Sequence, residues 1–375
     1  MKKHPQLAVT VAACLICIVA TAVICLRVIR SDEDMAKYRE IEAVIEEYYI
    51  GVIDPQVRSE YISAAQVAAL DDRWSQYLSA KDYAAHQAFA ANSYVGIGIT
   101  VDLDETSRLP KVVALTPDSP AALAGLEVGN LLLSLGANAL EEKEPADVRT
   151  LIESYGENSF YLTVQNAQGA TRMVELRSRL VFSNPVSYEM LGGGIGYVKL
   201  RNFETGCSEG LRAAVDALSG ANALIFDVRD NPGGKLTELI DALDCLLPAG
   251  DVFISRSRDG EETIYSSDAA CVALPMAVLI NGNSYSAAEF FAAVLQEYEV
   301  ATIVGEPTTG KGRSQVAVEL TDGSAILISN HLYTTPGGRD LAAVGGIVPD
   351  IEAAPREDDD FDVALHAAQV ALARR

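Results

Sequence analysis

The sequence predicts a multidomain α/β protein that begins with a transmembrane helix, and three observations lead to this class. Residues 7–26 contain no charged side chain. Residues 93–180 consist of short apolar runs separated by turn residues, and residues 195–304 alternate strand-like apolar runs with helix-periodic segments. The last pattern is typical of a sheet covered by helices. We therefore expect a membrane anchor (1–30), a helical region (31–92), a β-rich domain (93–180) and a mixed α/β domain (181–375).

Composition argues against two classes of function. The chain has 375 residues and a formal net charge of −23, whereas nucleic-acid binding requires basic surfaces. Its four histidines are dispersed, which gives no support to a zinc site. Cys207, Cys245 and Cys271, the cysteines outside the N-terminal apolar run, show no metal-binding spacing, so we expect free thiols. We predict no metal and no cofactor.

The N-terminal apolar run predicts a single membrane-spanning helix. Residues 7–26 would span roughly 30 Å as a helix, which is enough to cross a bilayer. Two lysines precede the run and two arginines follow it, so the flanking charge specifies the orientation only weakly. A signal peptide cleaved near residues 20–22 is the alternative, but the apolar run continues beyond that point and favours an uncleaved anchor.

Two amphipathic helices are expected after the anchor. The first covers residues 35–50, with apolar side chains at helical spacing, and the second begins at Pro55. Residues 71–78 follow them and contain Trp74, the only tryptophan of the chain, which we interpret as a structural anchor.

The segment from 278 to 315 carries the chemistry. It reads as strand, turn, helix, strand and glycine-rich loop. Ser286 stands where the first strand gives way to the helix, so its hydroxyl can project from a tight turn beside the unpaired N–H groups of the helix start. Lys311 follows the second strand and could act as a base if burial lowers its pKa by several units. Gln315 could then hold the neutral amine.

Two simpler interpretations compete with a serine–lysine pair. Ser286 could be an ordinary helix cap. The pattern from Gly305 to Lys311 also matches a phosphate-binding P-loop up to its last position, where Gly312 replaces the Ser or Thr that would hold Mg²⁺. That replacement disfavours nucleotide binding.

Residues 284–289, residues 305–312 and Gln315 together resemble the catalytic core of the carboxyl-terminal processing peptidases, also called tail-specific proteases. Alignment on Glu289 places the family nucleophile at Ser286 and not at Ser284. The resemblance implies that Lys311 is the base and Gln315 its partner. This chain departs from the family pattern at Tyr285, Ala288 and Thr309, and none of these is a functional position.

The resemblance continues over nearly all of the chain after the first helix. Residues 229–234 resemble the family's Arg-x-Asn-Pro-Gly-Gly sequence, which implies that Gly233 or Gly234 contributes a backbone N–H to an oxyanion hole. Ala287 would supply the second N–H. The simpler alternative for residues 229–234 is an ordinary Pro-Gly turn.

Three segments of the β-rich region resemble a PDZ domain. They are the run 96–99, the pattern 119–129 and a predicted helix at 145–155. In such a domain, backbone N–H groups at the first segment bind the terminal carboxylate of a peptide, which adds to the following edge strand. The resemblance therefore implies a peptide site at Gly96, Ile97, Gly98 and Ile99.

The resemblance as a whole implies a membrane-anchored serine endopeptidase that binds the C-terminal tails of proteins. The family usually works across the membrane, so its catalytic domain would lie on the extracytoplasmic side of a single-pass helix. The helical region contributes to dimers in some relatives, which suggests a homodimer. The alternative is a catalytically inactive PDZ-containing scaffold, which the intact Ser286, Lys311 and Gln315 disfavour.

Overall fold

The computed structural model describes residues 35–355 and 361–374, and the chain divides after Ser63 into two compact units. In the N-terminal unit, residues 35–48 are helical, and helix α2 (Pro55–Ala68) starts there. The Asp54 carboxylate accepts hydrogen bonds from the first N–H groups of α2, which is the usual way a helix start is satisfied. Both amphipathic helices expected after the anchor are therefore present.

The predicted membrane anchor at residues 7–26 lies outside the described part of the chain. Among residues 35–355 and 361–374, no helix combines the length and the apolar character needed to cross a bilayer.

Residues 97–177 fold around a hydrophobic core of their own, which extends from Ile97 to Leu176. Their sheet has the order β3-β4-β5-β7-β8, with β6 paired to β5. The elements of this region are β3 (Ile99–Leu103), β4 (Pro110–Leu115), α4 (Pro120–Leu123), β5 (Leu131–Leu135), β6 (Asn138–Ala139), α5 (Pro145–Ser154), β7 (Ser159–Gln165) and β8 (Thr171–Arg177). Just before and after them, β2 (Ser93–Gly96) pairs with β9 (Arg179–Phe182) in antiparallel fashion.

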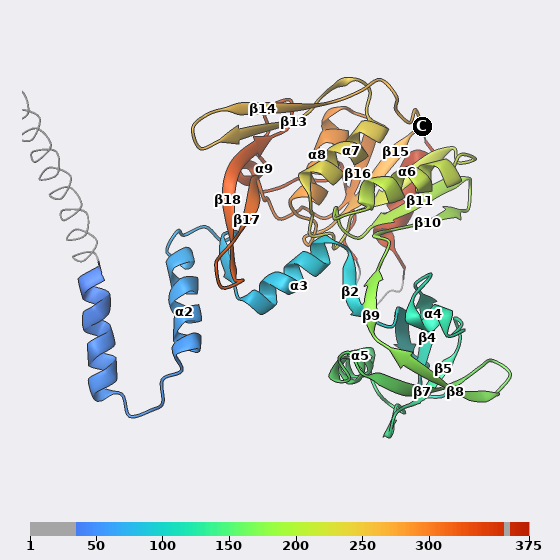
Figure 1. Ribbon diagram of the computed structural model, residues 1–375. Helices are drawn as coiled ribbons and strands as arrows, with labels where there is room; N and C mark the ends of the chain where they lie inside the picture. Colours follow the sequence, from blue (N-terminus) through green and yellow to red (C-terminus); the bar gives the residue numbers. More distant parts are fainter. Residues whose placement is uncertain (1–34, 356–360, 375) are drawn as a thin grey trace, which may run out of the picture. The chain divides into compact units, whose positions relative to one another are not determined.

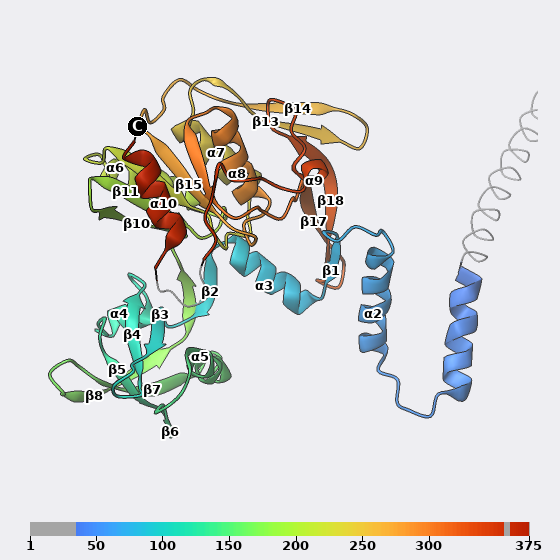
Figure 2. The same ribbon diagram turned by 180° about the vertical axis from the view of Figure 1, so that it is seen from behind.

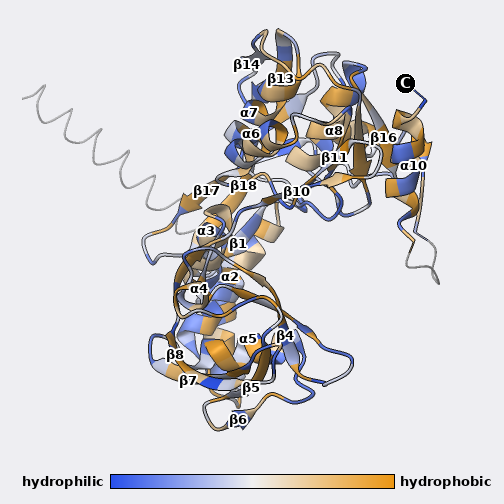
Figure 3. Ribbon diagram, turned by 90° about the vertical axis from the view of Figure 1, so that its right-hand side faces the viewer, coloured by the Kyte–Doolittle hydropathy of each residue, from blue (hydrophilic) through white to orange (hydrophobic). Residues whose placement is uncertain are grey.

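A second sheet of six strands forms the centre of the following region, with the order β10-β11-β12-β15-β16-β19. The first strand is antiparallel to its neighbour and the others run parallel. Every residue of β12 and β15 is buried, as expected for strands covered on both faces. The strands are β10 (Val186–Leu191), β11 (Ile195–Leu200), β12 (Ala223–Asp227), β15 (Met276–Ile280), β16 (Ala301–Gly305) and β19 (Ile351–Glu352). Strand β16 is hydrophobic along most of its length (Figure 3).

Alternate side chains of this sheet enter two different cores, because successive residues of a strand point to opposite faces. On β12, Leu224 and Phe226 belong to the larger core, whereas Ala223 and Ile225 belong to the smaller one. Helices α6, α7 and α8 cover the first face (Figure 1) and α10 covers the second (Figure 2). The helices of this region are α6 (Cys207–Ala217), α7 (Leu236–Leu246), α8 (Ala287–Glu297), α9 (Leu341–Val344) and α10 (Val363–Leu372).

A third sheet carries distant parts of the chain. Its order is β1-β18-β13-β14, and β17 also pairs with β18. The short strand β1 pairs with the start of β18, at Gln76 opposite Leu327, so a segment from before residue 80 joins the C-terminal half. The elements are β1 (Gln76–Leu78), β13 (Gly250–Ser257), β14 (Glu262–Ser267), β17 (Arg313–Glu319) and β18 (Ala325–Thr334), and α3 (Ala80–Ala90) follows β1.

The mixed α/β class predicted from sequence is confirmed by these sheets and helices. The apolar run that begins at residue 195 forms β11, which ends at Leu200, because the backbone then turns to meet the loop at Gly234. Strands β17 and β18 form a hairpin with its turn at Gly323. Strand β1 and the β13–β14 hairpin were not predicted. The PDZ identity of residues 93–180 and the domain boundaries remain predictions.

Candidate active site

Six of the predicted site residues border one cavity of about 690 Å³. The volume lies in the range of clefts that take up peptide side chains or small ligands. These six residues, which come from three separate segments, are Gly233, Gly234, Ser286, Ala287, Lys311 and Gln315. Parallel pairing of β12, β15 and β16 explains the convergence, because the loops that follow parallel strands emerge at the same end of the sheet.

Ser286 occupies a strained turn between β15 and α8. Its backbone has φ 58° and ψ −122°, outside the small left-handed region that non-glycine residues tolerate. Such a conformation costs on the order of 1–3 kcal/mol and persists only when the surroundings impose it. The neighbouring Ser284 is fully buried and donates its hydroxyl to the Val228 carbonyl at 2.7 Å, so it serves the turn. Of the two serines, only Ser286 borders the cavity.

The loop after β12, which contains Gly233, packs directly against this turn. A Cβ atom on Gly233 would lie 2.8 Å from Cβ of Ser286 and 2.9 Å from the Ala287 nitrogen, so only glycine fits there. The Gly233 N–H already donates to Oδ1 of Asn231 at 2.8 Å. In the described part of the chain, neither Gly234 N–H nor Ala287 N–H has a hydrogen-bond acceptor. These two N–H groups are therefore free for a ligand at the cavity.

A buried carboxylate joins the serine turn to the lysine loop. The side chain of Glu289 is fully buried, and its Oε2 accepts hydrogen bonds from the N–H groups of Ser286 and Lys311, both at 2.9 Å. Its Oε1 accepts from Gly310 N–H and the Thr308 hydroxyl, both at 2.5 Å. Four donors thus satisfy one charge, which holds the two loops at a fixed separation.

These contacts also bear on the P-loop alternative. A P-loop uses its backbone N–H groups to cradle phosphate oxygens. Here the N–H groups of Gly310 and Lys311 are occupied by the Glu289 carboxylate, and a bound phosphate would meet that negative charge. The loop therefore has the sequence pattern of a P-loop without its binding surface.

Lys311 lies in a partly apolar environment, and burial lowers the pKa of its amine to about 8, while Asp72 and Glu289 raise it. Nζ donates a hydrogen bond to Oε1 of Gln315. The Gln315 amide in turn donates to the backbone carbonyl of Trp74, so the predicted partner role of Gln315 has a matching geometry. Nζ also lies 4.9 Å from the centre of the Trp74 ring.

Lys311 and Ser286 share the cavity, yet no hydrogen bond joins the amine to the hydroxyl. The Ser286 hydroxyl instead interacts with the phenol of Tyr333. That phenol donates to the backbone carbonyl of Lys311. Burial raises the pKa of Tyr333 above its ordinary value, although the contact with Ser286 lowers it, so the phenol stays neutral.

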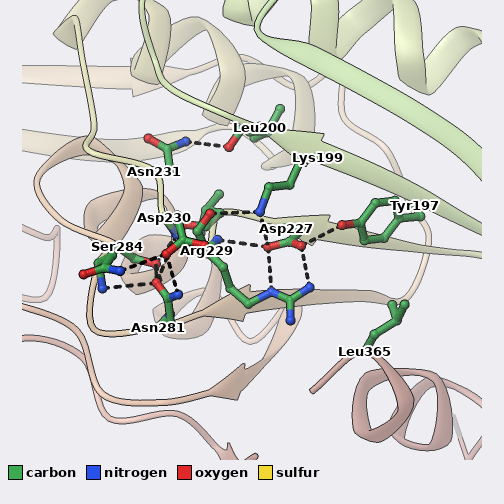
Figure 4. A network of polar contacts seen from close by, with 12 residues as sticks. Tyr197, Lys199, Leu200, Asp227, Arg229, Asp230, Asn231, Asn281, Ser284 and Leu365 are labelled. Carbon is green, nitrogen blue, oxygen red and sulfur yellow. Dashed lines mark hydrogen bonds and ion pairs between the residues drawn. The ribbon is translucent and has the colours of Figure 1, made fainter. Parts of the chain in front are cut away.

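A network of charges supports the loop that carries Gly233 and Gly234 (Figure 4). The carboxylate of Asp227, at the end of β12, receives the Arg229 guanidinium at 2.7 Å, the Lys199 amine at 3.1 Å and the Tyr197 hydroxyl at 2.6 Å. Arg229 also pairs with Asp362, just before α10, at 2.8 Å. This cluster connects β11, β12 and α10 beneath the loop.

Sequence reasoning missed three residues that shape the site. From the sequence, Glu289 serves only for the alignment, Trp74 is interpreted as a structural anchor, and Tyr333 has no assigned role. The fully buried glutamate in an apolar run was a signal that could have been used, because an unpaired buried carboxylate is costly. Nothing in the sequence indicates that Trp74 lies next to Gln315, 241 positions away.

The predicted peptide site lies elsewhere. Ile97 is buried, and Gly98 has φ 81° and passes so close to Ser119 that a side chain could not fit. Strand β3, which starts at Ile99, has β4 on one side and no other strand beside it in the described chain. The expected edge position of this strand is therefore confirmed, while peptide binding there remains a prediction.

Comparison with known proteins finds similarity to a peptidase family and to its processing members. Residues 194–353 match the model of peptidase family S41. The chain is 30% identical over 316 residues to carboxyl-terminal-processing peptidase 2, chloroplastic, of Arabidopsis thaliana, covering 79% of this chain and 61% of that protein. It is 27% identical over 356 residues to a carboxy-terminal-processing protease of Bartonella bacilliformis, covering 90% and 80% of the two chains.

Solved structures show the same fold. A photosystem II D1 C-terminal processing protease matches with a TM-score of 0.50 and 25% identity, over 88% of this chain and 90% of that one. A putative S41 protease from Bacteroides fragilis matches with a TM-score of 0.56 and 16% identity, over 87% and 93% of the two chains. The chain spans 61 to 66% of the length of the chloroplast relatives from Arabidopsis and Tetradesmus obliquus. The chain is thus similar to peptidase family S41 over residues 194–353 and to carboxyl-terminal processing peptidases over most of its length.

Proposed function

We propose that this protein is a serine endopeptidase that cleaves near the C-terminal tails of other proteins, with Ser286 as nucleophile and Lys311 as base. The observation that carries the proposal is the strained Ser286 turn beside two free N–H groups, in one cavity with a lysine whose pKa is lowered to about 8. A lysine in this state is partly neutral near physiological pH and can accept a proton.

The reaction proceeds through an acyl-enzyme. Ser286 Oγ attacks the scissile carbonyl and passes its proton to neutral Lys311, while the N–H groups of Gly234 and Ala287 bind the oxyanion. Lys311 then protonates the leaving amine, and the C–N bond breaks. A water molecule, deprotonated by Lys311, attacks the ester carbonyl. Lys311 then returns this proton to Ser286 Oγ as the ester bond breaks, which releases the acid product and restores the starting state. Gly234 is preferred to Gly233 because the Gly233 N–H is already bonded to Asn231.

The protein binds its substrate through the β-rich region and is held at a membrane by its N-terminal run. Residues 93–180 act as a PDZ domain that binds a free carboxyl terminus at the loop Gly96–Ile99, beside the open edge of β3. The charge-free run 7–26 anchors the chain in a membrane, with the catalytic domain on the extracytoplasmic side. Dimer formation through the helical region is supported only by the resemblance described above.

The assignment of Ser286 and Lys311 is tested with two variants and two matched controls. Ser286→Ala and Lys311→Met should each lower kcat/KM for a tail peptide by on the order of 10⁴-fold, because each removes a group that takes part in bond formation. Ser219→Ala and Lys143→Met alter exposed residues of the same types and should keep the wild-type rate. Full activity in either site variant would refute the assignment.

Tail recognition is tested with pairs of peptides that differ only in a free or an amidated carboxyl terminus. The free acid should be cleaved at least tenfold more efficiently at low concentration, because only it offers a carboxylate to the loop at 96–99. An inactive scaffold would bind the same peptides without cleaving them. It would also fail to react with a fluorophosphonate probe, which labels an activated serine.

The protonation of Lys311 predicts the pH profile. Since burial lowers its pKa to about 8, the neutral amine becomes more abundant as the pH rises toward that value. The parameter kcat/KM should increase about tenfold per pH unit below pH 7 and level off above about pH 8.5. A profile that is flat between pH 6 and 9 would contradict a lysine base.

A further inference from the structure

Two aromatic rings lie against the amine of Lys311. The Trp74 and Tyr285 rings stack with their centres 6.0 Å apart and an angle of 26° between their planes. Nζ of Lys311 is 4.9 Å from the centre of the Trp74 ring and 6.0 Å from that of Tyr285. A cation within about 6 Å of an aromatic ring is attracted by the negative face of the ring. The amine is thus in contact range of two π-systems.

The three residues come from separate parts of the chain and are held by polar contacts. Trp74 precedes β1, Tyr285 precedes the nucleophile, and Lys311 lies in the loop between β16 and β17. Gln315 accepts from the Lys311 amine and donates to the carbonyl of Trp74, which closes a ring of contacts. Asp72 fixes the tryptophan backbone by accepting from its N–H at 3.2 Å.

The charged groups around the amine are few. Asp72 and Glu289 are the anions whose charge acts on Lys311. Among cations, the Arg73 guanidinium lies 4.3 Å from the centre of the Trp74 ring, and the Arg313 charge acts on Asp72. Neither carboxylate forms a salt bridge with Lys311 in the described chain. The nearest stabilising groups for the charged amine are therefore the two rings and the Gln315 amide oxygen.

Two titratable phenols also face this region. Burial raises the pKa of Tyr285 above its ordinary value, so its ring remains uncharged. The Tyr333 phenol donates to the carbonyl of Lys311 and interacts with the Ser286 hydroxyl, as described above. Both members of the catalytic pair thus have partners other than each other.

We propose that Trp74 and Tyr285 form a seat that holds the Lys311 ammonium in a resting position, which the amine must leave before it can take the proton of Ser286. The proposal rests on the proposed peptidase function. Trp74 and Tyr285 are positioning residues, because they act on the lysine and not on the substrate. Tyr285 borders the cavity, so a peptide that enters the cavity and contacts its ring would shift this ring away from the Lys311 amine. The amine would then be free to move toward Ser286. The seat then links substrate binding to activation of the base.

The test separates the π-system of each ring from its bulk. Tyr285→Leu and Trp74→Leu keep an apolar side chain but remove the ring, whereas Tyr285→Phe and Trp74→Phe keep a ring. All four substitutions keep the Trp74 carbonyl that holds Gln315. The titration of Lys311 is followed by NMR in protein labelled with ¹³C-lysine, and the Lys311→Met spectrum identifies its signal.

The leucine variants should lower the pKa of Lys311 by about half a unit, because they remove the attraction that favours the ammonium form. The phenylalanine variants should stay near the wild-type value. The acid side of the kcat/KM profile should also move to lower pH by about half a unit. In the leucine variants, kcat/KM at pH 6.5 should therefore be about threefold higher than in the wild type. A merely structural role of the rings would change the rate without moving the titration.

Equal titration curves for the leucine and phenylalanine variants would overturn the proposal, whether or not both differ from the wild type. Tyr285 is partly exposed, so Tyr285→Leu carries the test if Trp74→Leu proves unstable in thermal unfolding. Failure of the peptidase assignment would look different. The wild-type protein would then neither cleave peptides nor react with a fluorophosphonate, while the NMR titration would still report on the seat.

Discussion

Two buried carboxylates of the α/β region, Asp227 and Glu289, accept hydrogen bonds from different kinds of donor. Asp227 is 1% exposed, and its partners are mainly side chains: the cations of Lys199 and Arg229 and the hydroxyl of Tyr197, with one backbone N–H, that of Arg229, at 2.9 Å. Glu289 is fully buried and has no cation within salt-bridge distance in the described chain. Three of its four donors are backbone N–H groups. Both arrangements satisfy the rule that a buried charge needs partners.

The difference shows what each carboxylate controls. Most donors to Asp227 are side chains from separate elements, so this carboxylate mainly joins secondary-structure elements and fixes the following loop through one backbone N–H only, that of Arg229. Backbone N–H groups cannot rotate independently of their chain, so Glu289 sets the positions of Ser286 and Lys311 relative to each other. We infer that Glu289 governs catalytic geometry and that Asp227 governs stability.

The largest expected effect follows from Glu289→Gln. The neutral amide cannot satisfy four donors, and its own NH₂ group would face some of them. We expect a loss of kcat/KM of at least 100-fold, together with a decrease in the free energy of unfolding of about 3 kcal/mol. Steady-state kinetics and urea unfolding measure the two effects. Glu299→Gln changes an exposed acid just beyond the same helix and should alter neither.

Asp227→Asn should produce a stability loss of similar size with a much smaller effect on activity. Removing one partner of a buried ion pair leaves uncompensated charge, at a cost of about 3 kcal/mol. Because Arg229 keeps its pair with Asp362, the loop above should stay in place, and kcat/KM per folded molecule should fall less than tenfold. A 100-fold loss in the folded variant would erase the distinction between the two carboxylates.

At low pH, protonation of Asp227 should lower the free energy of unfolding. Burial raises the pKa of Asp227, but hydrogen bonds from Arg229 and the charges of Lys199 and Arg229 outweigh it, so the pKa lies below its ordinary value. A lowered folded-state pKa contributes stability above the unfolded pKa near about 4, and this stability is lost as the pH falls further. The unfolding free energy of Asp227→Asn should therefore depend less on pH below about 4 than that of the wild type. Parallel curves would contradict this.

The smallest effects come from removing one hydroxyl donor at each carboxylate. Tyr197→Phe deletes one hydrogen bond to Asp227 and should cost about 1–2 kcal/mol in urea unfolding. Thr308→Val deletes the bond to Glu289 and also leaves the Ile347 N–H without its acceptor, so it should cost about 1 kcal/mol more. An equal cost in both variants would show that the Ile347 contact contributes nothing.

Much of the α/β region around the candidate site was predictable because its signals are local. The buried runs of β12, β15 and β16 and the turn residues between them are visible in the residue order, and parallel pairing then brings the loops together. For this reason Ser286 and Lys311 could be named before their distance in space was known. The orientation of the lysine could not be predicted. It depends on Trp74, whose distance along the chain hides the contact.

The sequence by itself determined most of the order of strands and helices, the apolar run at the N-terminus and the residue types of the proposed serine–lysine site. Only the tertiary structure decided which hydrogen-bonding groups remain free. Within the described residues, it left the N–H groups of Gly234 and Ala287 without an acceptor, occupied those of Gly310 and Lys311, and placed the lysine amine near two aromatic rings. The reason is physical: residue order specifies which groups can donate or accept, but the partner of each is settled by long-range packing.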